Sequence, residues 1–287
     1  MNTVESKDGT AIAFDKAGHG PALILVDGAL CYRGAGPSKS VAAELSADFT
    51  VFTYDRRGRG ESGDTSPYAV EREIEDLGAL IEEAGGSASL CGFSSGAVLA
   101  LDAANRGLGV EKLALYEPPF IVDDSRAPLP DDYPSRLDRL IAADRRGDAL
   151  RLFMGQVGMP KVLVALMRFM PAWSKLKSVA PTLSNDAAVM GDTQSGRSLP
   201  AERWNAVTAP TLVIAGGKSP EWMQNGTRAL AAMLPSAERR SLEGQTHMVK
   251  AKPLAPLLKE YLAGARPHVA FDALVAHTAT KASSPQD

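Results

Sequence analysis

A serine between two glycines is the residue whose surroundings most clearly indicate chemistry. Ser94 lies in GFSSG, residues 92–96, after an apolar run and before a helical pattern at 95–106. This order of strand, turn and helix is typical of a nucleophile elbow, in which a sharp turn presents a serine hydroxyl at the edge of a sheet. The pattern therefore predicts that Ser94 is a nucleophile. The alternative is that Ser94 is only a small residue in a tight turn.

A nucleophilic serine needs a base, because a free hydroxyl gives up its proton poorly and histidine titrates in the right range. Among the four histidines, His247 lies between the last predicted strand and the last predicted helix. His19 lies in an early loop, and His268 and His277 lie near the C-terminus. We therefore expect His247 to be the base, with a structural loop histidine as the alternative.

Strand and helix patterns alternate along the chain and must position these two residues. Near-continuous apolar strands at 21–28, 49–55, 87–92, 111–117 and 209–217 are of the kind buried on both faces. Helical patterns lie at 38–46, 69–84, 95–106 and 222–234, and alternating runs around Asp8 and Gly9 predict a hairpin. The alternation predicts an α/β protein with a doubly wound, mostly parallel sheet.

The alternation stops in a helix-rich segment that several prolines interrupt. We expect this segment to be a helical cap inserted after the sixth strand. The predicted regions are a first part of the core at 1–119, the cap at 120–205 and a second part of the core at 206–264. We expect residues 265–287 to form a tail that is partly disordered.

Six segments form a set that is far more specific than the serine turn alone: LILVDGAL, VFTYDRRGRGESG, CGFSSG, LALYEPPF, PTLVIAGG and GQTHMV. In this order they resemble the α/β-hydrolase fold superfamily, in particular its capped esterase, lactonase and non-haem haloperoxidase-like branch. The resemblance extends from about Val4 to Gly264. It implies a serine, an acid and a histidine in that chain order, and it implies that DRRGRGESG is a structural turn and not a phosphate loop.

In the family that this chain resembles, the acid of the triad follows one of two core strands. The usual end, after TLVIAGG, carries KSP at 218–220, which contains no acid. Some members place the acid after the preceding core strand, where this chain has Glu117. We expect Glu117 to hold the far imidazole nitrogen of His247 and so fix its tautomer. Asp192 is the alternative acid, and a dyad without an acid is a further alternative.

The resemblance assigns the oxyanion hole to the backbone amides of Ala29 and Ser95. The family commonly has a histidine where this chain has Asp27. A carboxylate there would repel a developing oxyanion unless it is neutral, paired or turned away. Arg33 or Arg57 is the expected partner. Two interpretations stay open: Asp27 hydrogen-bonds its own loop, or the site favours substrates other than simple esters.

Composition and charge narrow the class of ligand. The chain has 287 residues and a formal net charge of −3, and its basic residues are scattered, which disfavours nucleic acid. The polar N-terminus lacks the regions of a signal peptide, and no apolar run is long enough to cross a bilayer. We therefore expect a cytoplasmic protein that does not bind a membrane. We expect no metal and no cofactor. The residues expected to line a substrate pocket are Cys31, Phe93, Phe153, Trp173 and Trp222.

These observations predict a cofactor-free serine hydrolase that cleaves an ester, thioester or lactone of a small apolar substrate through an acyl-enzyme. Ser94 excludes the dehalogenase and epoxide hydrolase reactions, which use aspartate at the elbow. A non-hydrolytic protein, either a metabolite-binding protein or a cyclase or lyase with a degenerate triad, is the alternative from another class. A perhydrolase or haloperoxidase-like side activity is a third. The expected partner is a small molecule, and a homodimer is left open.

Overall fold

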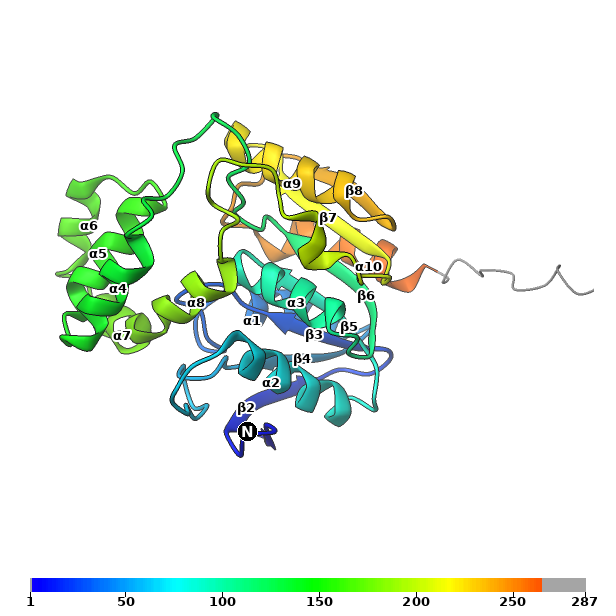
Figure 1. Ribbon diagram of the computed structural model, residues 1–287. Coiled ribbons are helices and arrows are strands. Elements are labelled where there is room, and N and C mark those ends of the chain that lie inside the picture. Colours follow the sequence, from blue (N-terminus) through cyan, green and yellow to red (C-terminus); the bar gives the residue numbers. More distant parts are fainter. Residues whose placement is uncertain (1, 265–287) are drawn as a thin grey trace, which may run out of the picture.

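An eight-stranded, mostly parallel sheet forms the centre of the computed structural model, which describes residues 2–264 (Figure 1). The strands are β1 Asn2–Glu5, β2 Ala11–Ala17, β3 Ala22–Val26, β4 Thr50–Tyr54, β5 Ala88–Phe93, β6 Val110–Tyr116, β7 Thr211–Gly216 and β8 Ala237–Leu242. Their order in the sheet is β1-β2-β4-β3-β5-β6-β7-β8. The pairs β1–β2 and β2–β4 are antiparallel and the others are parallel. The predicted fold class is confirmed. The expected C-terminal tail lies outside the described residues.

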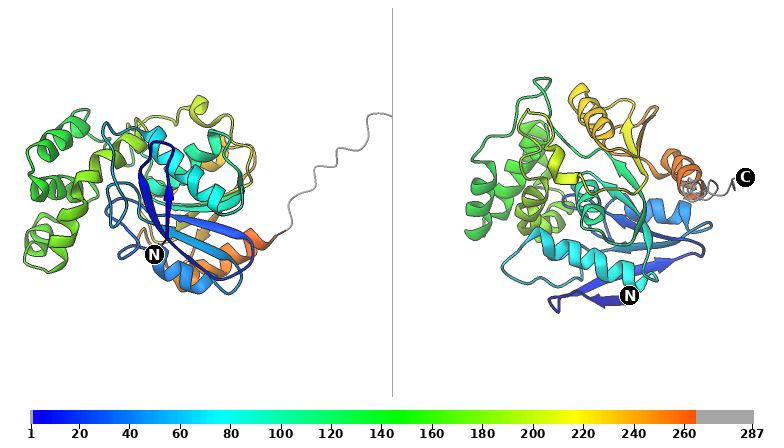
Figure 2. Two further views of the ribbon diagram at one scale, coloured as in Figure 1. Left: turned by 90° about the horizontal axis from the view of Figure 1, so that it is seen from below. Right: turned by 45° about the vertical axis from the view of Figure 1, so that its right-hand side comes forward.

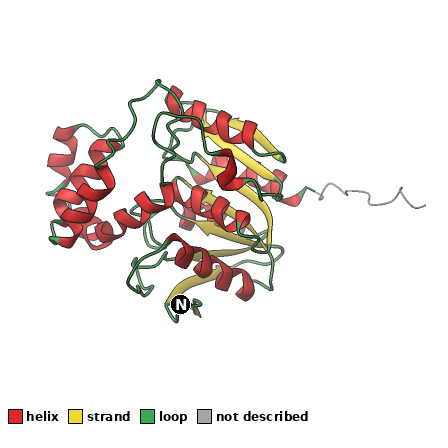
Figure 3. Ribbon diagram, viewed as in Figure 1, coloured by secondary structure: helices red, strands yellow, loops and turns green. Residues whose placement is uncertain are grey.

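Helices cover both faces of the sheet, which is why its strands are apolar throughout. In β3, Ile24 and Val26 join the core on one face, and Leu23 and Leu25 join the core on the other. Figure 3 shows the strands enclosed between helices. The helices on the first face are α2 Val70–Glu83, α3 Ser95–Asn105 and α9 Glu221–Met233, and those on the second are α1 Ser38–Leu45 and α10 Ala251–Ala263.

A helical segment is inserted between β6 and β7, after the sixth strand as predicted. Its helices are α4 Tyr133–Ala142, α5 Arg146–Gln156, α6 Lys161–Met167, α7 Ala172–Val179 and α8 Leu183–Met190. Both views of Figure 2 show α4 to α7 as a group beside the sheet. Helix α8 connects this group to the core, since it packs on both α4 and α3. No helix within residues 2–264 combines the length and apolar character needed to span a membrane.

Candidate active site

Ser94 occupies the sharp turn between β5 and α3, with φ 55° and ψ −125°. This backbone conformation is strained for any residue except glycine. The turn also forces strand and helix close together: a Cβ at Gly96 would lie 2.2 Å from the carbonyl oxygen of Val26, and one at Gly92 would lie 2.5 Å from Cα of Ala97. The two glycines that flank Ser94 are therefore required by the geometry of the elbow.

Glu117 lies directly after β6, and its side chain is fully buried beside His247. Its Oε2 lies 3.0 Å from Nδ1 of His247, while Oε1 accepts a 2.6 Å hydrogen bond from the amide of Gly216. The preceding residue, Tyr116, donates its hydroxyl to the carbonyl of Thr246 at 2.7 Å. The end of β6 thus holds both the imidazole ring and the loop that carries it.

Ser94 and His247 line one cavity of about 520 Å³. The cavity lies between the carboxyl ends of the central strands and the inserted helices α4, α5 and α8, and its lining is largely apolar. Within residues 2–264, Ser94 Oγ makes no hydrogen bond. A hydrogen bond between a nucleophile and its base often tightens only when substrate binds.

Ala29 and Ser95, whose backbone amides are the predicted oxyanion hole, both line the same cavity. Ser95 is the first residue of α3, so its N–H has no partner inside the helix. Ala29 follows β3, and neither its N–H nor that of Ser95 has a hydrogen-bond acceptor among the described residues. A Cβ at Gly28 would lie 2.9 Å from Cβ of Ser94, so this loop lies directly against the elbow. The two amides, called the donor site below, meet the geometric requirement of the oxyanion hole predicted for Ala29 and Ser95.

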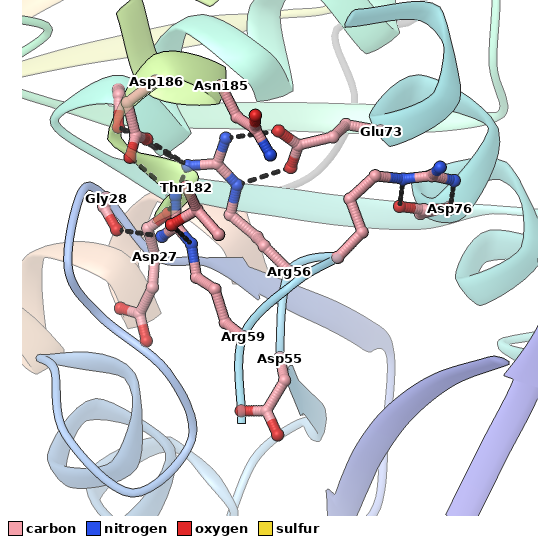
Figure 4. A network of polar contacts seen from close by, with 12 residues as sticks. Asp27, Gly28, Asp55, Arg56, Arg59, Glu73, Asp76, Thr182, Asn185 and Asp186 are labelled. Carbon is pink, nitrogen blue, oxygen red and sulfur yellow. Dashed lines mark hydrogen bonds and ion pairs between the residues drawn. The ribbon is translucent and has the colours of Figure 1, made fainter. Parts of the chain in front are cut away.

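Arg59 fixes the loop that carries Ala29. Its guanidinium donates to the carbonyl of Gly28 at 2.6 Å and to that of Cys31 at 3.2 Å. Its second terminal nitrogen, Nη2, donates to Asp186 of α8 at 2.7 Å (Figure 4). A residue of the inserted segment therefore helps to hold the loop through a buried arginine.

Asp186 also holds the side chain of Ser95, the residue that carries the second amide. Its Oδ1 accepts from Ser95 Oγ and from Arg56, each at 2.7 Å, and Arg56 forms a further ion pair with Glu73 at 2.6 Å (Figure 4). Burial raises the pKa of Asp186, but the adjacent guanidinium groups of Arg59 and Arg56 outweigh burial and hold the pKa below its ordinary value. One anionic carboxylate is thus linked to both segments of the donor site.

Asp27 is turned away from this cluster (Figure 4) and does not line the cavity. The amide of Ser38 donates to its Oδ1 at 3.3 Å, and burial raises the pKa of Asp27 to about 6. The expected partners Arg33 and Arg57 pair with other carboxylates instead. The interpretation that Asp27 hydrogen-bonds the loop at its own strand end agrees with this geometry.

Of the five expected pocket residues, Phe153 and Trp222 line the cavity and three do not. Phe93 belongs to the core on the side of α1 and α10, where its ring lies 6.3 Å from that of Tyr116. Trp173 packs among the inserted helices. Cys31 lies against Gly36 at the base of the loop, and burial raises the pKa of its thiol to about 12.

The alternative acid is remote from the histidine. Asp192 is exposed and lines a neighbouring depression that does not include Ser94 or His247. The residue at the usual acid position, Ser219, is buried and its hydroxyl has no hydrogen-bond partner among the described residues. Among the candidate acids, Glu117 alone contacts His247 within residues 2–264.

Three residues of the site were not singled out in the sequence. Arg59 lies in a segment interpreted as a structural turn, while Asp186 and Arg126 lie in the inserted helices and loops. No motif links them: Arg59 meets Asp186 through α8, and Arg126 meets Trp222 and Gln156, which lie far from it in the chain. In the part of the chain described, no cluster of His, Cys, Asp or Glu side chains is arranged to hold a metal ion.

Comparison with known proteins gives a family and its solved structures. A family model described as "Alpha/beta hydrolase family" matches residues 17–257. The crystal structure of an alpha/beta hydrolase from Sphaerobacter thermophilus is 50% identical, with a TM-score of 0.84 over 91% of this chain and 100% of that chain. The enol-lactonase from Burkholderia xenovorans is 20% identical, with a TM-score of 0.66 over 92% of this chain and 100% of that chain, which shows a shared fold.

A curated relative has a stated activity. The pimeloyl-(acyl-carrier protein) methyl ester esterase of Xanthomonas campestris is 28% identical over 241 residues, which cover 81% of this chain and 90% of that protein.

Proposed function

Because this chain belongs to the alpha/beta hydrolase family, we propose that it hydrolyses carboxylic esters, thioesters or lactones through an acyl-enzyme on Ser94. The observation that carries the proposal is the contact between Glu117 and Nδ1 of His247 on the wall of the cavity that contains Ser94. This contact leaves Nε2 as the ring nitrogen that accepts the proton of the serine. The esterase activity of the Xanthomonas relative agrees with this chemistry.

The reaction would proceed in two halves. In the first, Ser94 attacks the carbonyl carbon as His247 takes its proton, and the amides of Ala29 and Ser95 hold the tetrahedral oxyanion. His247 then protonates the departing alcohol, which leaves the acyl group on Ser94. In the second half, His247 activates water, which releases the acid and restores the serine.

The cavity supports a small-molecule substrate with apolar portions. Its apolar lining includes Leu129, Phe153 and Met190, and its volume of about 520 Å³ is within the range of small-ligand sites. Polar groups gather near Ser94 and near the loop that carries Arg126. This distribution favours a substrate whose scissile carbonyl lies at Ser94 and whose body contacts the inserted helices.

A non-hydrolytic role had two arguments, the missing acid after β7 and the carboxylate of Asp27 where the family has a histidine. Glu117 supplies a carboxylate to His247 from the preceding strand, and Asp27 lies outside the cavity. Neither departure from the family pattern therefore argues against hydrolysis. No separate observation favours a cyclase, lyase or haloperoxidase-like reaction.

The test is pre-steady-state hydrolysis of p-nitrophenyl hexanoate. We expect a burst of nitrophenolate equal to about one per chain, because this activated ester should acylate Ser94 faster than water removes the acyl group. Ser94→Ala should give no burst, whereas Ser135→Ala, on the exposed side of α4, should retain it. Hydrolysis by Ser94→Ala at the wild-type rate would contradict the proposal.

A further inference from the structure

Arg126 is the one arginine or lysine among the described residues that line the cavity. Its guanidinium lies over the ring of Trp222, with 4.2 Å between the guanidinium carbon and the ring centroid, and donates to the carbonyl of Gln156. The side chain is half-buried. It is therefore held in place at the cavity wall from two sides.

No carboxylate within residues 2–264 forms an ion pair with Arg126. Asp123, three residues before Arg126, accepts hydrogen bonds from Ser125 and Asn225 instead. Burial lowers the pKa of Arg126, and no neighbouring acid offsets that effect. A half-buried guanidinium without a counter-ion is costly to keep, since its charge is partly removed from water.

Other buried arginines of the structure, unlike Arg126, are paired with carboxylates. Arg56 faces both Glu73 and Asp186, and Arg57 faces both Asp8 and Asp76. Asp186 is the one carboxylate among the described lining residues, and Arg56 and Arg59 already pair with it. The cavity thus contains a positive group whose partner must come from elsewhere.

We propose that Arg126 binds a carboxylate of the substrate, remote from the scissile carbonyl, so that the preferred substrates are esters or lactones that carry a second, acidic group. This inference rests on the proposed hydrolase function. A guanidinium has five N–H donors, and its planar fork matches a carboxylate in a bidentate arrangement. Stacking on Trp222 holds the fork in place before the substrate arrives.

Two esters of equal chain length test the inference. p-Nitrophenyl hexanoate ends in a methyl group, and the mono-p-nitrophenyl ester of adipic acid ends in a carboxylate. In Arg126→Gln we expect the preference for the adipate ester over the hexanoate, measured as the ratio of kcat/KM, to fall by about 10- to 100-fold, mainly through KM. Arg126→Lys should keep part of the preference, because it keeps the charge but loses the fork.

The control is Arg139→Gln, which removes an exposed arginine of α4 that lies outside the cavity and forms no ion pair with a carboxylate of residues 2–264. It should leave the ratio unchanged. A ratio that is the same in wild type and Arg126→Gln would overturn the inference and leave the proposed hydrolase intact.

Measuring binding in a variant that cannot turn over substrate separates the anion site at Arg126 from the proposed hydrolase activity. Ser94→Ala should bind monomethyl adipate in calorimetry, and Ser94→Ala with Arg126→Gln should bind it about 10-fold or more weakly. If wild type hydrolyses neither ester but this difference in binding persists, the hydrolase proposal fails and the anion site is supported. Equal binding by both variants would overturn the anion site.

Discussion

Glu117 Oε2 lies 3.0 Å from Nδ1 of His247, although 130 residues separate the two in the chain. Glu117 follows β6 and His247 follows β8, so the sheet order brings two carboxyl ends to one edge. The carboxylate is fully buried and the imidazole is partly exposed to the cavity. This arrangement gives the histidine one defined tautomer and orientation.

Removing the charge of Glu117 tests that relationship. We expect Glu117→Gln to lower kcat on a p-nitrophenyl ester by about 10³-fold or more, because the amide cannot stabilise the imidazolium that forms as Ser94 attacks. Circular dichroism should show an unchanged fold. The matched control, Asp192→Asn, removes an exposed acid and should retain wild-type kcat. A large loss in Asp192→Asn with no loss in Glu117→Gln would contradict the assignment.

Asp186 should contribute both to the stability of the fold and to the rate of turnover. Asp186→Asn leaves Arg59 without a carboxylate, and removing one partner of a buried ion pair costs about 3–5 kcal/mol of unfolding free energy. Kinetics should show a larger fall in kcat than rise in KM, because both segments of the proposed oxyanion hole, those of Ala29 and Ser95, are linked to Asp186.

Urea unfolding measures the stability effect, with Asp148→Asn as the control. Asp148 pairs with Arg145 and Arg151 at the surface, and such pairs contribute less than about 1 kcal/mol. An unfolding free energy for Asp186→Asn equal to that of wild type would show that the cluster is not a stabilising ion-pair network.

Asp27 should make stability depend on pH. Burial raises the pKa of Asp27 from 3.8 to about 6, so the folded state holds this proton more tightly than the unfolded state does. Its favourable contribution is therefore complete below about pH 4 and is lost as the pH rises through about 6. Asp27→Asn cannot titrate. Relative to wild type, the variant should gain about 2 kcal/mol of unfolding free energy between about pH 4 and pH 7.

Denaturant unfolding of wild type and Asp27→Asn at about pH 4 and at pH 7 measures this change in unfolding free energy. A difference between Asp27→Asn and wild type that does not change with pH would mean that Asp27 keeps an ordinary pKa in the folded protein.

The torsion angles of Ser94 predict a stability difference between two inactive variants. Ser94→Gly relieves the strain of the positive φ, whereas Ser94→Ala retains it. We expect the glycine variant to be about 1 kcal/mol more stable than the alanine variant in thermal unfolding. Equal stability, or a more stable alanine variant, would argue against a strained elbow.

Much of the fold follows from patterns that span whole elements. Apolar runs buried on both faces predict a parallel sheet, and the interruption before Thr211 predicts the inserted helices. Ser94, Glu117 and His247 all lie directly after strands or in the loop that follows one, so their positions in the chain also indicate where they lie in space. Their shared location at one edge of the sheet could therefore be predicted from the sequence.

Side-chain direction could not be found in the same way. Every residue of β5 is buried, so the sequence carries no alternation that tells on which face Phe93 lies. Trp173 recurs at helical spacing with other apolar residues, but that spacing does not distinguish the face toward the cavity from the face toward neighbouring helices. The contact of Arg59 with Asp186 joins positions 127 residues apart and depends on the path of α8.

The most direct test of the central claim is intact-mass spectrometry after exposure to a fluorophosphonate. We expect wild type to gain one phosphonyl group, Ser94→Ala to gain none, and His247→Ala to react far more slowly than wild type, since an activated serine needs its base. Labelling of Ser94→Ala to the same extent as wild type, or no labelling of folded wild type, would contradict an activated nucleophile at Ser94.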